Sequence, residues 1–309
     1  FLKPYVGEAL AHYPMVARYY AYELTCHSDF RMFQCTANYL REPDRCRRCA
    51  VRAMGPEIKR WKMLSWTQEY VAARAFMPSY YELTLRFLKR CRSIIVYNRI
   101  QRELLTGFHE NVHIVPGGVN VDEFAFSTKV PPHAGGRPRI ILMTGRVEDP
   151  AKGFSTLSEA AERLAQTRSD FEVWVTHTDP GINRPWMKAI GWKTPTEMRA
   201  LYGQADICVV ASVWEEPFGM VAVEAMASGR PVCASRVGGL QDIVLDGETG
   251  FLFERGDSAT LEEHLARLLD DRDLCERMGT AGRQRAEREY DWVGIVERYY
   301  PQILEELTR

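Results

Sequence analysis

The sequence predicts an α/β protein whose sheets are parallel and doubly wound. From residue 139 on, short apolar runs alternate with amphipathic segments of helical period, which is typical of repeated strand–helix–strand units. The chain has 309 residues, of which 46% are hydrophobic, enough for two cores, so we expect two domains. No run of about 18 apolar residues occurs, so we expect no membrane-spanning helix.

The first part of the chain, residues 1–127, mixes strand and helix signals. Its expected elements are a buried strand in "YPMVARYY" (13–20), a helical stretch over 70–92 with a break at Pro78, and strands in "SIIVYN" (93–98) and "VHIVPGGVN" (112–120). A Pro- and Gly-rich stretch, residues 127–139, then predicts a linker. We therefore expect one domain over 1–127 and a second over 138–291.

The second part has a regular rhythm. Strands are expected at 140–145, 171–176, 206–212, 231–235 and 250–253, and helices at 154–167, 194–204 and 219–229, with another opening within 238–247 and a helical tail from residue 258. Ligands of doubly wound sheets bind at the carboxyl ends of the strands. The loops after these strands are therefore the places where a site is expected.

Charge is shared unevenly along the chain. Residues 1–130 carry 19 Lys or Arg and 12 Asp or Glu, a net charge of +7, and the remainder carries −8. Basic residues concentrate in 41–62 and in "RFLKRCR" (86–92). These stretches indicate either a solvated helical face or a contact with anionic lipid headgroups or a phosphorylated acceptor. No nucleic-acid recognition motif accompanies the charge, so no nucleic-acid partner is expected.

Four of the eight cysteines are close in sequence: Cys26, Cys35, Cys46 and Cys49. The two-residue gap in "CRRC" is that of a metal knuckle, and four thiols make a structural zinc site one interpretation. The irregular first spacings leave reduced or partly disulfide-bonded thiols as the other. The remaining cysteines stand singly in apolar or helical contexts and are interpreted as core or surface thiols.

The stretch "VWEEPFG", residues 213–219, lies where a buried strand ends and a helix begins. Gly219 leaves room for an approaching group, and the amides of the following helix N-terminus favour an anion such as phosphate. Glu216 in the loop and Glu224 in the helix can accept hydrogen bonds from sugar or ribose hydroxyls. The alternative is that Glu215 and Glu216 complement the helix dipole and Glu224 is solvated.

A second loop, "TGRVEDPAKG" (144–153), also follows a strand. It brings two cations, Arg146 and Lys152, to the same edge of the sheet. A departing diphosphate needs its developing charge neutralised, and two fixed cations can do this without a metal. The alternative is a loop with ordinary surface charges.

Taken together, these blocks resemble the retaining glycosyltransferases of family 4. The resemblance is carried by "EPFGMVAVEAMASGRPV" with Glu216 and Glu224, by "TGRVEDPAKG", and by "VPGGVNVDEF", "ADICVVAS", "VGGLQDIVLDGETGFLF" and the terminal "YDW", in the family's order. It extends from about Ser93 to Tyr299 and is weak before that. It implies a GT-B fold, with two Rossmann-like domains facing across a cleft and the 292–309 helix packing back on the first.

The resemblance also implies roles for individual residues. Arg146 and Lys152 would bind the diphosphate, Glu216 the transferred sugar and Glu224 the ribose. The remaining donor-binding positions are Gly145 in the phosphate block, the backbone of Phe218, Gly219, Met220 and Val221 beside sugar and phosphates, and Gly191 and Trp192 beside the base.

The implied activity is transfer of a sugar from a UDP- or GDP-linked donor to a hydroxyl acceptor, with retention and without a metal or other cofactor. The acceptor is a glycan, a lipid-linked molecule or a small molecule, and the expected location is cytoplasmic, with peripheral contact at the inner face of the membrane as an extension. A non-catalytic nucleotide-sugar-binding or scaffold relative is the alternative. A phosphorylase-like enzyme ranks last, since no lysine for a pyridoxal cofactor is recognisable.

Two features depart from the family pattern. The opening strand and glycine-rich loop of the first domain are not found, so we expect that domain to be incomplete in this sequence. Relatives often carry a histidine after the strand that corresponds to 13–20, and here Tyr20 takes the position. Tyr20 is a tentative acceptor-side residue, although a tyrosine is a poor base near neutral pH, and packing against a neighbouring aromatic is the favoured interpretation.

Overall fold

The computed structural model describes residues 3–22, 38–46, 48–49, 52, 78–126 and 138–308. Its contacts divide the chain into two compact units, Phe1–Pro116 with Arg298–Arg309, and Gly117–Glu297. Residues 117–126 therefore group with the second unit, whereas the sequence pattern placed the end of the first domain at residue 127. Arg283 explains the grouping, because its guanidinium donates to the carbonyls of Val121 and Phe124.

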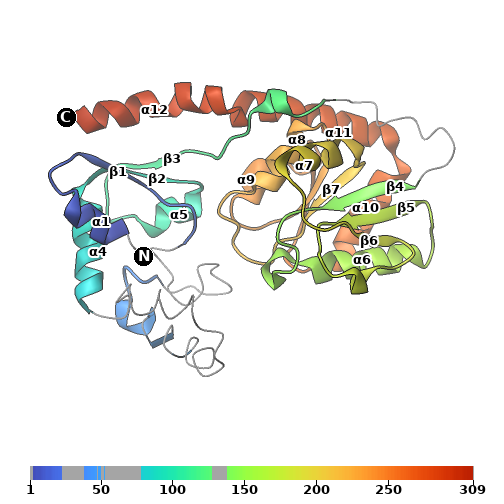
Figure 1. Cartoon of the computed structure of the whole chain (residues 1–309), viewed down its shortest axis with the longest axis horizontal. Helices are drawn as coiled ribbons and strands as arrows, with labels where there is room; N and C mark the ends of the chain where they lie inside the picture. The colour runs from blue at the N-terminus through green and yellow to red at the C-terminus, as the bar shows by residue number, and fades with distance from the viewer. Residues whose placement is uncertain are drawn as a thin grey trace. The chain divides into compact units, whose positions relative to one another are not determined.

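The first unit is built on a parallel sheet in the order β1-β2-β3 (Figure 1). Its strands are β1 (Met15–Arg18), β2 (Cys91–Val96) and β3 (Val112–Ile114), and its helices are α1 (Lys3–Ala9), α4 (Pro78–Arg90), α5 (Arg99–Leu104) and the end of α12 (Trp292–Thr308). All three predicted strands are present. The predicted break at Pro78 is the start of α4, where proline is tolerated because the first helical N–H has no partner within the helix.

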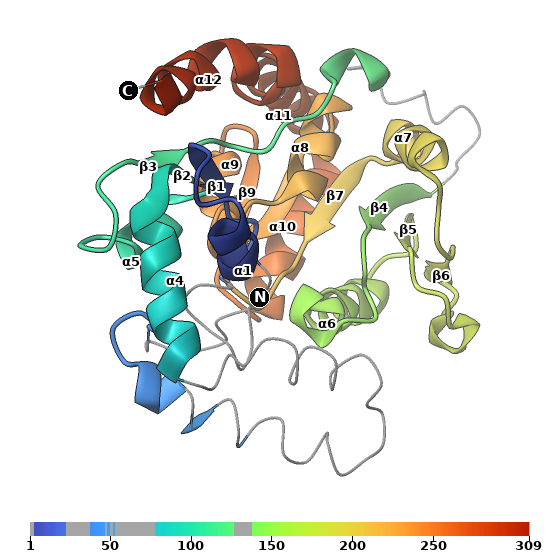
Figure 2. The same cartoon turned by 60° about the vertical axis from the view of Figure 1, so that its left-hand side comes forward.

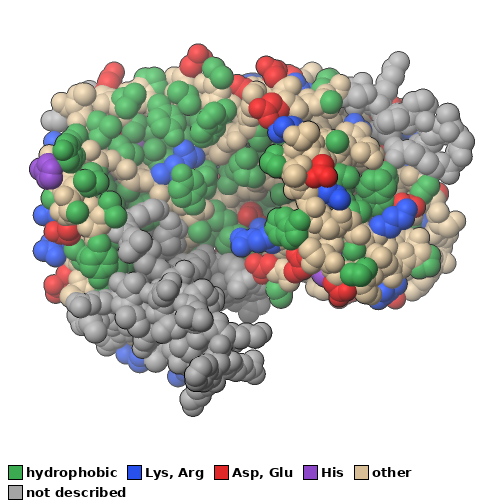
Figure 3. All heavy atoms as spheres, in the orientation of Figure 1, with side chains coloured by type: hydrophobic (Ala, Val, Ile, Leu, Met, Phe, Trp, Pro, Cys, Tyr) green, Lys and Arg blue, Asp and Glu red, His purple; other side chains and the backbone are tan. Residues whose placement is uncertain are grey.

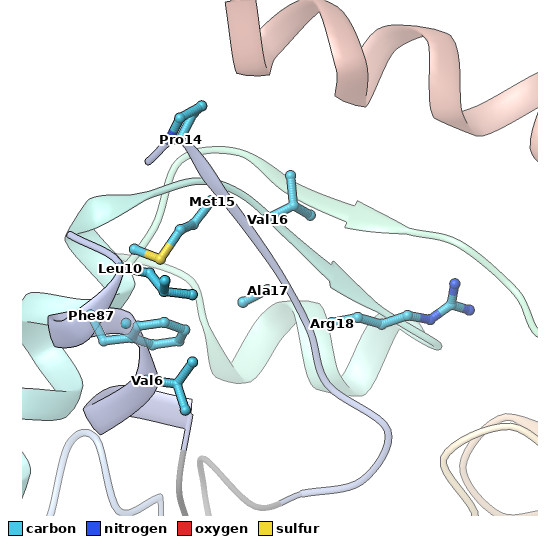
Figure 4. A pocket seen from close by; sticks show the side chains of 9 residues that line it. Val6, Leu10, Pro14, Met15, Val16, Ala17, Arg18 and Phe87 are labelled. Carbon is cyan, nitrogen blue, oxygen red and sulfur yellow. The ribbon is translucent and has the colours of Figure 1, made fainter. Parts of the chain in front are cut away.

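Helix α1 packs beside α4 in this unit (Figure 2). Between α1, β1 and α4 lies an apolar cavity of about 480 Å³. Figure 4 shows Val6, Leu10, Met15 and Phe87 gathered around it, whereas the guanidinium of Arg18 points away from them. Val6 and Leu10 are also exposed, so this space opens to the surface of the unit.

The last turns of α12 are held on this unit by polar contacts. Arg18 donates to the Tyr300 hydroxyl at 2.7 Å. The Glu306 carboxylate accepts from the Ser93 hydroxyl and lies 2.9 Å from Nε2 of His113. Ser93 is fully buried, so the end of the chain covers part of the sheet built from its beginning.

The second unit is built on a six-stranded parallel sheet in the order β6-β5-β4-β7-β8-β9. Its strands are β4 (Arg139–Met143), β5 (Phe171–Val175), β6 (Met187–Ala189), β7 (Ile207–Val210), β8 (Val232–Ser235) and β9 (Gly250–Phe253). Five of them match the predicted strands. The three-residue edge strand β6 was missed, since it is too short to show any periodicity.

Helices cover both faces of this sheet (Figure 1). They are α6 (Phe154–Ala165), α7 (Pro195–Gln204), α8 (Met220–Ala227), α9 (Leu240–Ile243), α10 (Ser258–Asp270) and α11 (Arg272–Arg285), followed by a π-helical turn (Ala286–Tyr290) that leads into α12. Helices α6 and α10 pack together on one face through Leu157, Leu164, Leu261 and Leu265. The sheet is thus buried on both sides, which explains why its strands are continuous apolar runs.

No helix in the described ranges is long and apolar enough to cross a membrane. The singly placed cysteines Cys91, Cys208, Cys233 and Cys275 are all buried. Burial raises the pKa of Cys91 to about 11 and that of Cys208 to about 12. These two thiols are therefore protonated core residues rather than nucleophiles.

Candidate functional site

The two loops singled out in the sequence meet at one edge of the second sheet. Strands β4 and β7 are neighbours, so their carboxyl ends lie side by side. The 3₁₀ turn Pro150–Lys152 after β4 joins the loop after β7 through a hydrogen bond from Val213 N to Ala151 O, 2.9 Å long. Gly153 approaches the carbonyl of Ala211 so closely that a side chain would collide with it. This packing fixes where Lys152 lies.

Lys152 and Glu216 form an ion pair at this junction. Nζ of Lys152 is 2.9 Å from Oε2 and 3.2 Å from Oε1 of Glu216. The Glu216 carboxylate also accepts from the Ser212 hydroxyl at 2.9 Å and from the indole N–H of Trp214 at 2.8 Å. The side chains of Lys152 and Glu216 are 23% and 13% exposed, so the pair is shielded but still reachable from solvent.

The N-terminus of α8 opens beside this ion pair. Gly219 precedes the helix with φ +124°, a conformation that L side chains rarely adopt, and a Cβ there would collide with Leu240. Gly145, after β4, has φ +99°, and a Cβ on it would lie 3.9 Å from Val221 in the first turn of α8. The amides of this turn and the bare backbone of Gly145 therefore border the same space.

Arg146 lies on the same loop as Gly145 and Lys152. Its side chain is exposed, and among the described residues it makes no hydrogen bond or ion pair. Within the described part of the chain it is a cation without a counterion, on the loop whose Gly145 borders the first turn of α8. An exposed guanidinium, an ammonium held by Glu216 and helix-end amides together would attract an anion.

Glu224 is held deeper in α8. Its carboxylate accepts a 2.8 Å hydrogen bond from the hydroxyl of Tyr202, which also lies 3.0 Å from the Thr144 hydroxyl. Burial raises the pKa of Glu224, and the bond from Tyr202 and the charge of Arg199 offset this only in part. Burial and the neighbouring Glu224 raise the pKa of Tyr202 well above its ordinary value, so its hydroxyl remains a donor. The interpretation of Glu224 as a solvated helix residue is therefore wrong.

The neighbouring acid Glu215 has a different environment. It accepts from the amide of Gly238 at 2.8 Å and pairs with Arg255. The loop after β8 is further tied to this segment by a 2.7 Å bond from Gly239 N to Glu216 O. Glu215 therefore fixes the backbone that carries Glu216, and neither acid merely complements the helix dipole.

Gly191 and Trp192 follow β6, two strands away from β4. Gly191 has φ +68° and donates its amide to His177 O at 3.0 Å. The side chain of Trp192 is 60% exposed. Their position beside a nucleotide base stays a prediction.

The structure thus brings together most of the predicted donor residues, all in the second unit. Tyr20 is in the first unit, 60% exposed, with its ring edge-on to Tyr97 at 5.8 Å. Cys46 is buried and Cys49 exposed, while Cys26 and Cys35 lie outside the described residues. The zinc interpretation is therefore untested, although the described ranges contain no cluster of side chains that could hold a metal ion.

The sequence did not single out four residues that the site contains: Ser212, Trp214, Tyr202 and Thr144. Trp214 stands in the predicted loop and Ser212 ends the predicted strand before it, so both are close to Glu216 in the sequence, which is a signal that could have been used. Tyr202 bonds to Glu224, 22 positions away, and Thr144 lies beside Tyr202, 58 positions away, so only the packed sheet brings these residues together.

The part of the chain that carries this site is similar in sequence to a known protein family. Residues 185–285 match the family model of glycosyl transferases group 1. This segment includes Glu216, Glu224 and the N-terminus of α8.

Individual relatives are similar over a longer part of the chain. The chain is 33% identical over 189 residues to the phosphatidyl-myo-inositol mannosyltransferase of Mycobacterium leprae, covering 58% of this chain and 49% of that protein. It is 30% identical over 194 residues to a glycogen synthase of Mycobacterium tuberculosis, covering 59% of this chain and 45% of that one. The chain thus spans about half the length of these relatives.

Solved structures define the fold class. Sucrose-phosphate synthase from Thermosynechococcus elongatus superposes with a TM-score of 0.69 at 22% identity, covering 99% of this chain and 71% of that one. Anabaena HepE in complex with UDP gives a TM-score of 0.63 at 20% identity, covering 74% and 68%. The predicted α/β fold of the GT-B class, with parallel sheets in both units, is confirmed.

Proposed function

We propose that this protein is a retaining glycosyltransferase that moves a sugar from a UDP- or GDP-linked donor to a hydroxyl acceptor. The observation that carries the proposal is the junction of Lys152, Glu216 and the α8 N-terminus at the carboxyl ends of β4 and β7. The family model of glycosyl transferases group 1 matches residues 185–285, which include Glu216 and the α8 N-terminus, and a structural neighbour was solved with UDP.

The donor would be held by three kinds of contact. Arg146, Lys152 and the α8 amides would bind the diphosphate, with Gly145 leaving its backbone open to the phosphates. Glu224, oriented by Tyr202, would accept from the ribose hydroxyls. Glu216 would accept from hydroxyls of the sugar, and the loop after β6, with Gly191 and Trp192, would border the base.

The reaction would then depend on orientation and charge. The acceptor oxygen would bond to the anomeric carbon on the face from which the diphosphate oxygen departs with the bonding electrons. The hydroxyl proton would pass to that departing oxygen. Arg146 and Lys152 would stabilise the charge that develops on the diphosphate, and this is the role for which other enzymes use a metal ion.

The acceptor side belongs to the first unit in this proposal, with Tyr20 as a tentative contact. Peripheral contact with an anionic membrane would extend the proposal. Two surface features support it: the exposed basic residues Arg86, Lys89, Arg90 and Arg92, and hydrophobic side chains gathered on the face of the N-terminal unit that Figure 3 shows. Tyr5, Val6, Leu10 and Tyr13 are exposed apolar or aromatic residues of this unit.

Nucleotide release from a panel of UDP- and GDP-linked sugars tests the proposal. The unmodified chain should release UDP or GDP, and Lys152→Ala or Glu216→Gln should each slow release at least about a hundredfold, because each removes a fixed group that the transition state uses. Lys188→Ala is the matched control, because Lys188 pairs with Glu172 at 2.7 Å outside the site. Unchanged release by the Lys152 and Glu216 variants would contradict the assignment. Tight donor binding without release from any sugar would identify a non-catalytic relative instead.

A further inference from the structure

Glu216 has an unusually complete set of partners for a residue that would bind a sugar. Its Oε2 accepts from Lys152, Ser212 and Trp214, all within 2.9 Å. Its Oε1 has, among the described residues, only the longer contact to Lys152, 3.2 Å. One carboxylate oxygen is therefore anchored by the protein, and the other keeps acceptor capacity for a ligand.

Trp214 contacts both members of the ion pair. Its indole N–H donates to Glu216, and Nζ of Lys152 lies 5.0 Å from the centre of its ring, within the range of a cation–π contact. An incoming diphosphate would compete with Glu216 for Lys152. The indole N–H does not depend on that competition, so it can hold the carboxylate when Lys152 turns toward phosphate.

We propose that Trp214 is a positioning residue for sugar transfer, a role that rests on the proposed function. Its N–H keeps the Glu216 carboxylate in one orientation toward the sugar hydroxyls, and its ring supports Lys152 beside the diphosphate. Ser212 shares the first task, since it anchors the same oxygen. Trp214 thus couples the group that orients the sugar to the group that stabilises the leaving diphosphate.

The same trio occurs a second time in this unit, outside the site. Trp174 donates its indole N–H to Glu172 at 2.8 Å, Lys188 pairs with Glu172 at 2.7 Å, and Nζ of Lys188 lies 6.0 Å from the Trp174 ring. Trp174 is only partly buried, as Trp214 is. Trp174→Phe therefore removes an equivalent hydrogen bond and serves as a matched control for Trp214→Phe.

The test compares Trp214→Phe with Trp174→Phe in the 309-residue chain. Phenylalanine keeps a ring under Lys152 but has no N–H. For Trp214→Phe we expect UDP and GDP, measured by calorimetry, to bind within about twofold of the unmodified protein, because in the proposed binding mode Glu216 contacts the sugar and not the nucleotide. Nucleotide release from the sugar donor should fall about tenfold to a hundredfold, the range expected for a lost hydrogen bond to a charged group. Trp174→Phe should change neither.

A crystal structure of Trp214→Phe supplies a readout that does not depend on activity. The Glu216 carboxylate should rotate or occupy more than one orientation, while the backbone of residues 213–219 stays in place. Unchanged release together with an unmoved carboxylate would overturn the positioning role. Equal losses in nucleotide binding and in release would also overturn it, because they would indicate general damage to the site. If the unmodified protein bound no nucleotide and released none, the proposed function would fail, whereas the carboxylate orientation would still test the role of Trp214.

Discussion

Glu216 and Glu224 are eight positions apart and partly buried, yet their surroundings differ in charge. Glu216 has a lysine partner, whereas the one hydrogen bond that the Glu224 carboxylate accepts among the described residues comes from the neutral hydroxyl of Tyr202. Burial raises the pKa of Glu224. A carboxylate kept in a poorly solvated position, with only the charge of Arg199 and one hydrogen bond to offset its burial, is costly to the fold, which is typical of groups retained for binding.

Replacing Glu224 with glutamine separates its contribution to ligand binding from its effect on the stability of the fold. The pKa of Glu224 is raised in the folded protein. Above the ordinary carboxyl pKa, ionisation of Glu224 therefore favours the unfolded state and lowers the free energy of unfolding. Below that pKa the carboxyl group is protonated in both the folded and the unfolded state, and the destabilisation disappears. We expect Glu224→Gln to raise the unfolding temperature near neutral pH, with the gain shrinking toward about pH 4. UDP or GDP affinity, measured by calorimetry, should fall about tenfold, since a charged acceptor is replaced by a neutral one.

Two outcomes would contradict this account of Glu224. One is a glutamine variant less stable than the parent near neutral pH, and the other is a stability gain that does not depend on pH. Tyr202→Phe is a complementary variant. It removes the one hydrogen-bond donor to the Glu224 carboxylate among the described residues and leaves the carboxylate in place. That variant should lose stability near neutral pH.

At the scale of elements, the positions of the strands and helices were largely predictable and their contacts were not. Helix α8 was expected at 219–229 and spans Met220–Ala227, and Thr194 caps α7 as a start signal. Strong apolar runs bounded by glycine, proline and capping residues explain this success. In contrast, the link from Glu215 to Arg255 and that from Tyr202 to Glu224 join segments with no shared local pattern. Such pairs depend on strand order, which the sequence does not display.

The loop that carries Lys152 provides a test at this scale. Gly153 has φ +72° and faces the carbonyl of Ala211. We expect Gly153→Ala to destabilise the protein by about 2–5 kcal/mol, through left-handed backbone strain and steric overlap, as measured by denaturant unfolding. Donor turnover should fall with it, because Lys152 would be displaced.

Gly247→Ala is the control for Gly153→Ala. Gly247 has a similar φ of +77°, but a Cβ there would meet nothing within 4 Å. It should therefore cost only about 1–2 kcal/mol and spare turnover. Equal losses of stability in the two variants would show that the contact with Ala211 does not matter.

At the scale of the whole molecule, net charge differs between the first part of the sequence and the remainder. Residues 1–130 carry a net charge of +7 and the remainder −8. We expect the protein to co-sediment with vesicles that contain phosphatidylglycerol, not with pure phosphatidylcholine, and to be released by about 0.5 M salt, because screening weakens exposed charge contacts.

Charge reversal locates the surface responsible. Lys89→Glu with Arg92→Glu should weaken vesicle binding. Arg272→Glu with Arg277→Glu changes the net charge equally on exposed positions of α11 and should leave binding intact. If the two double variants weakened vesicle binding equally, net charge alone would explain the attraction. The proposal of a specific membrane-binding surface would then be contradicted.

The final turns of α12 cover Ser93 and bond to Arg18, so the chain's last residues complete the unit that its first residues begin. A stop codon or protease cut shortly before Tyr300 would therefore harm the opposite end of the polypeptide. It would expose Ser93 on β2 to solvent and leave the core around β4 to β9 intact. A shortened product that still bound nucleotide would consequently not be evidence that the first unit is intact.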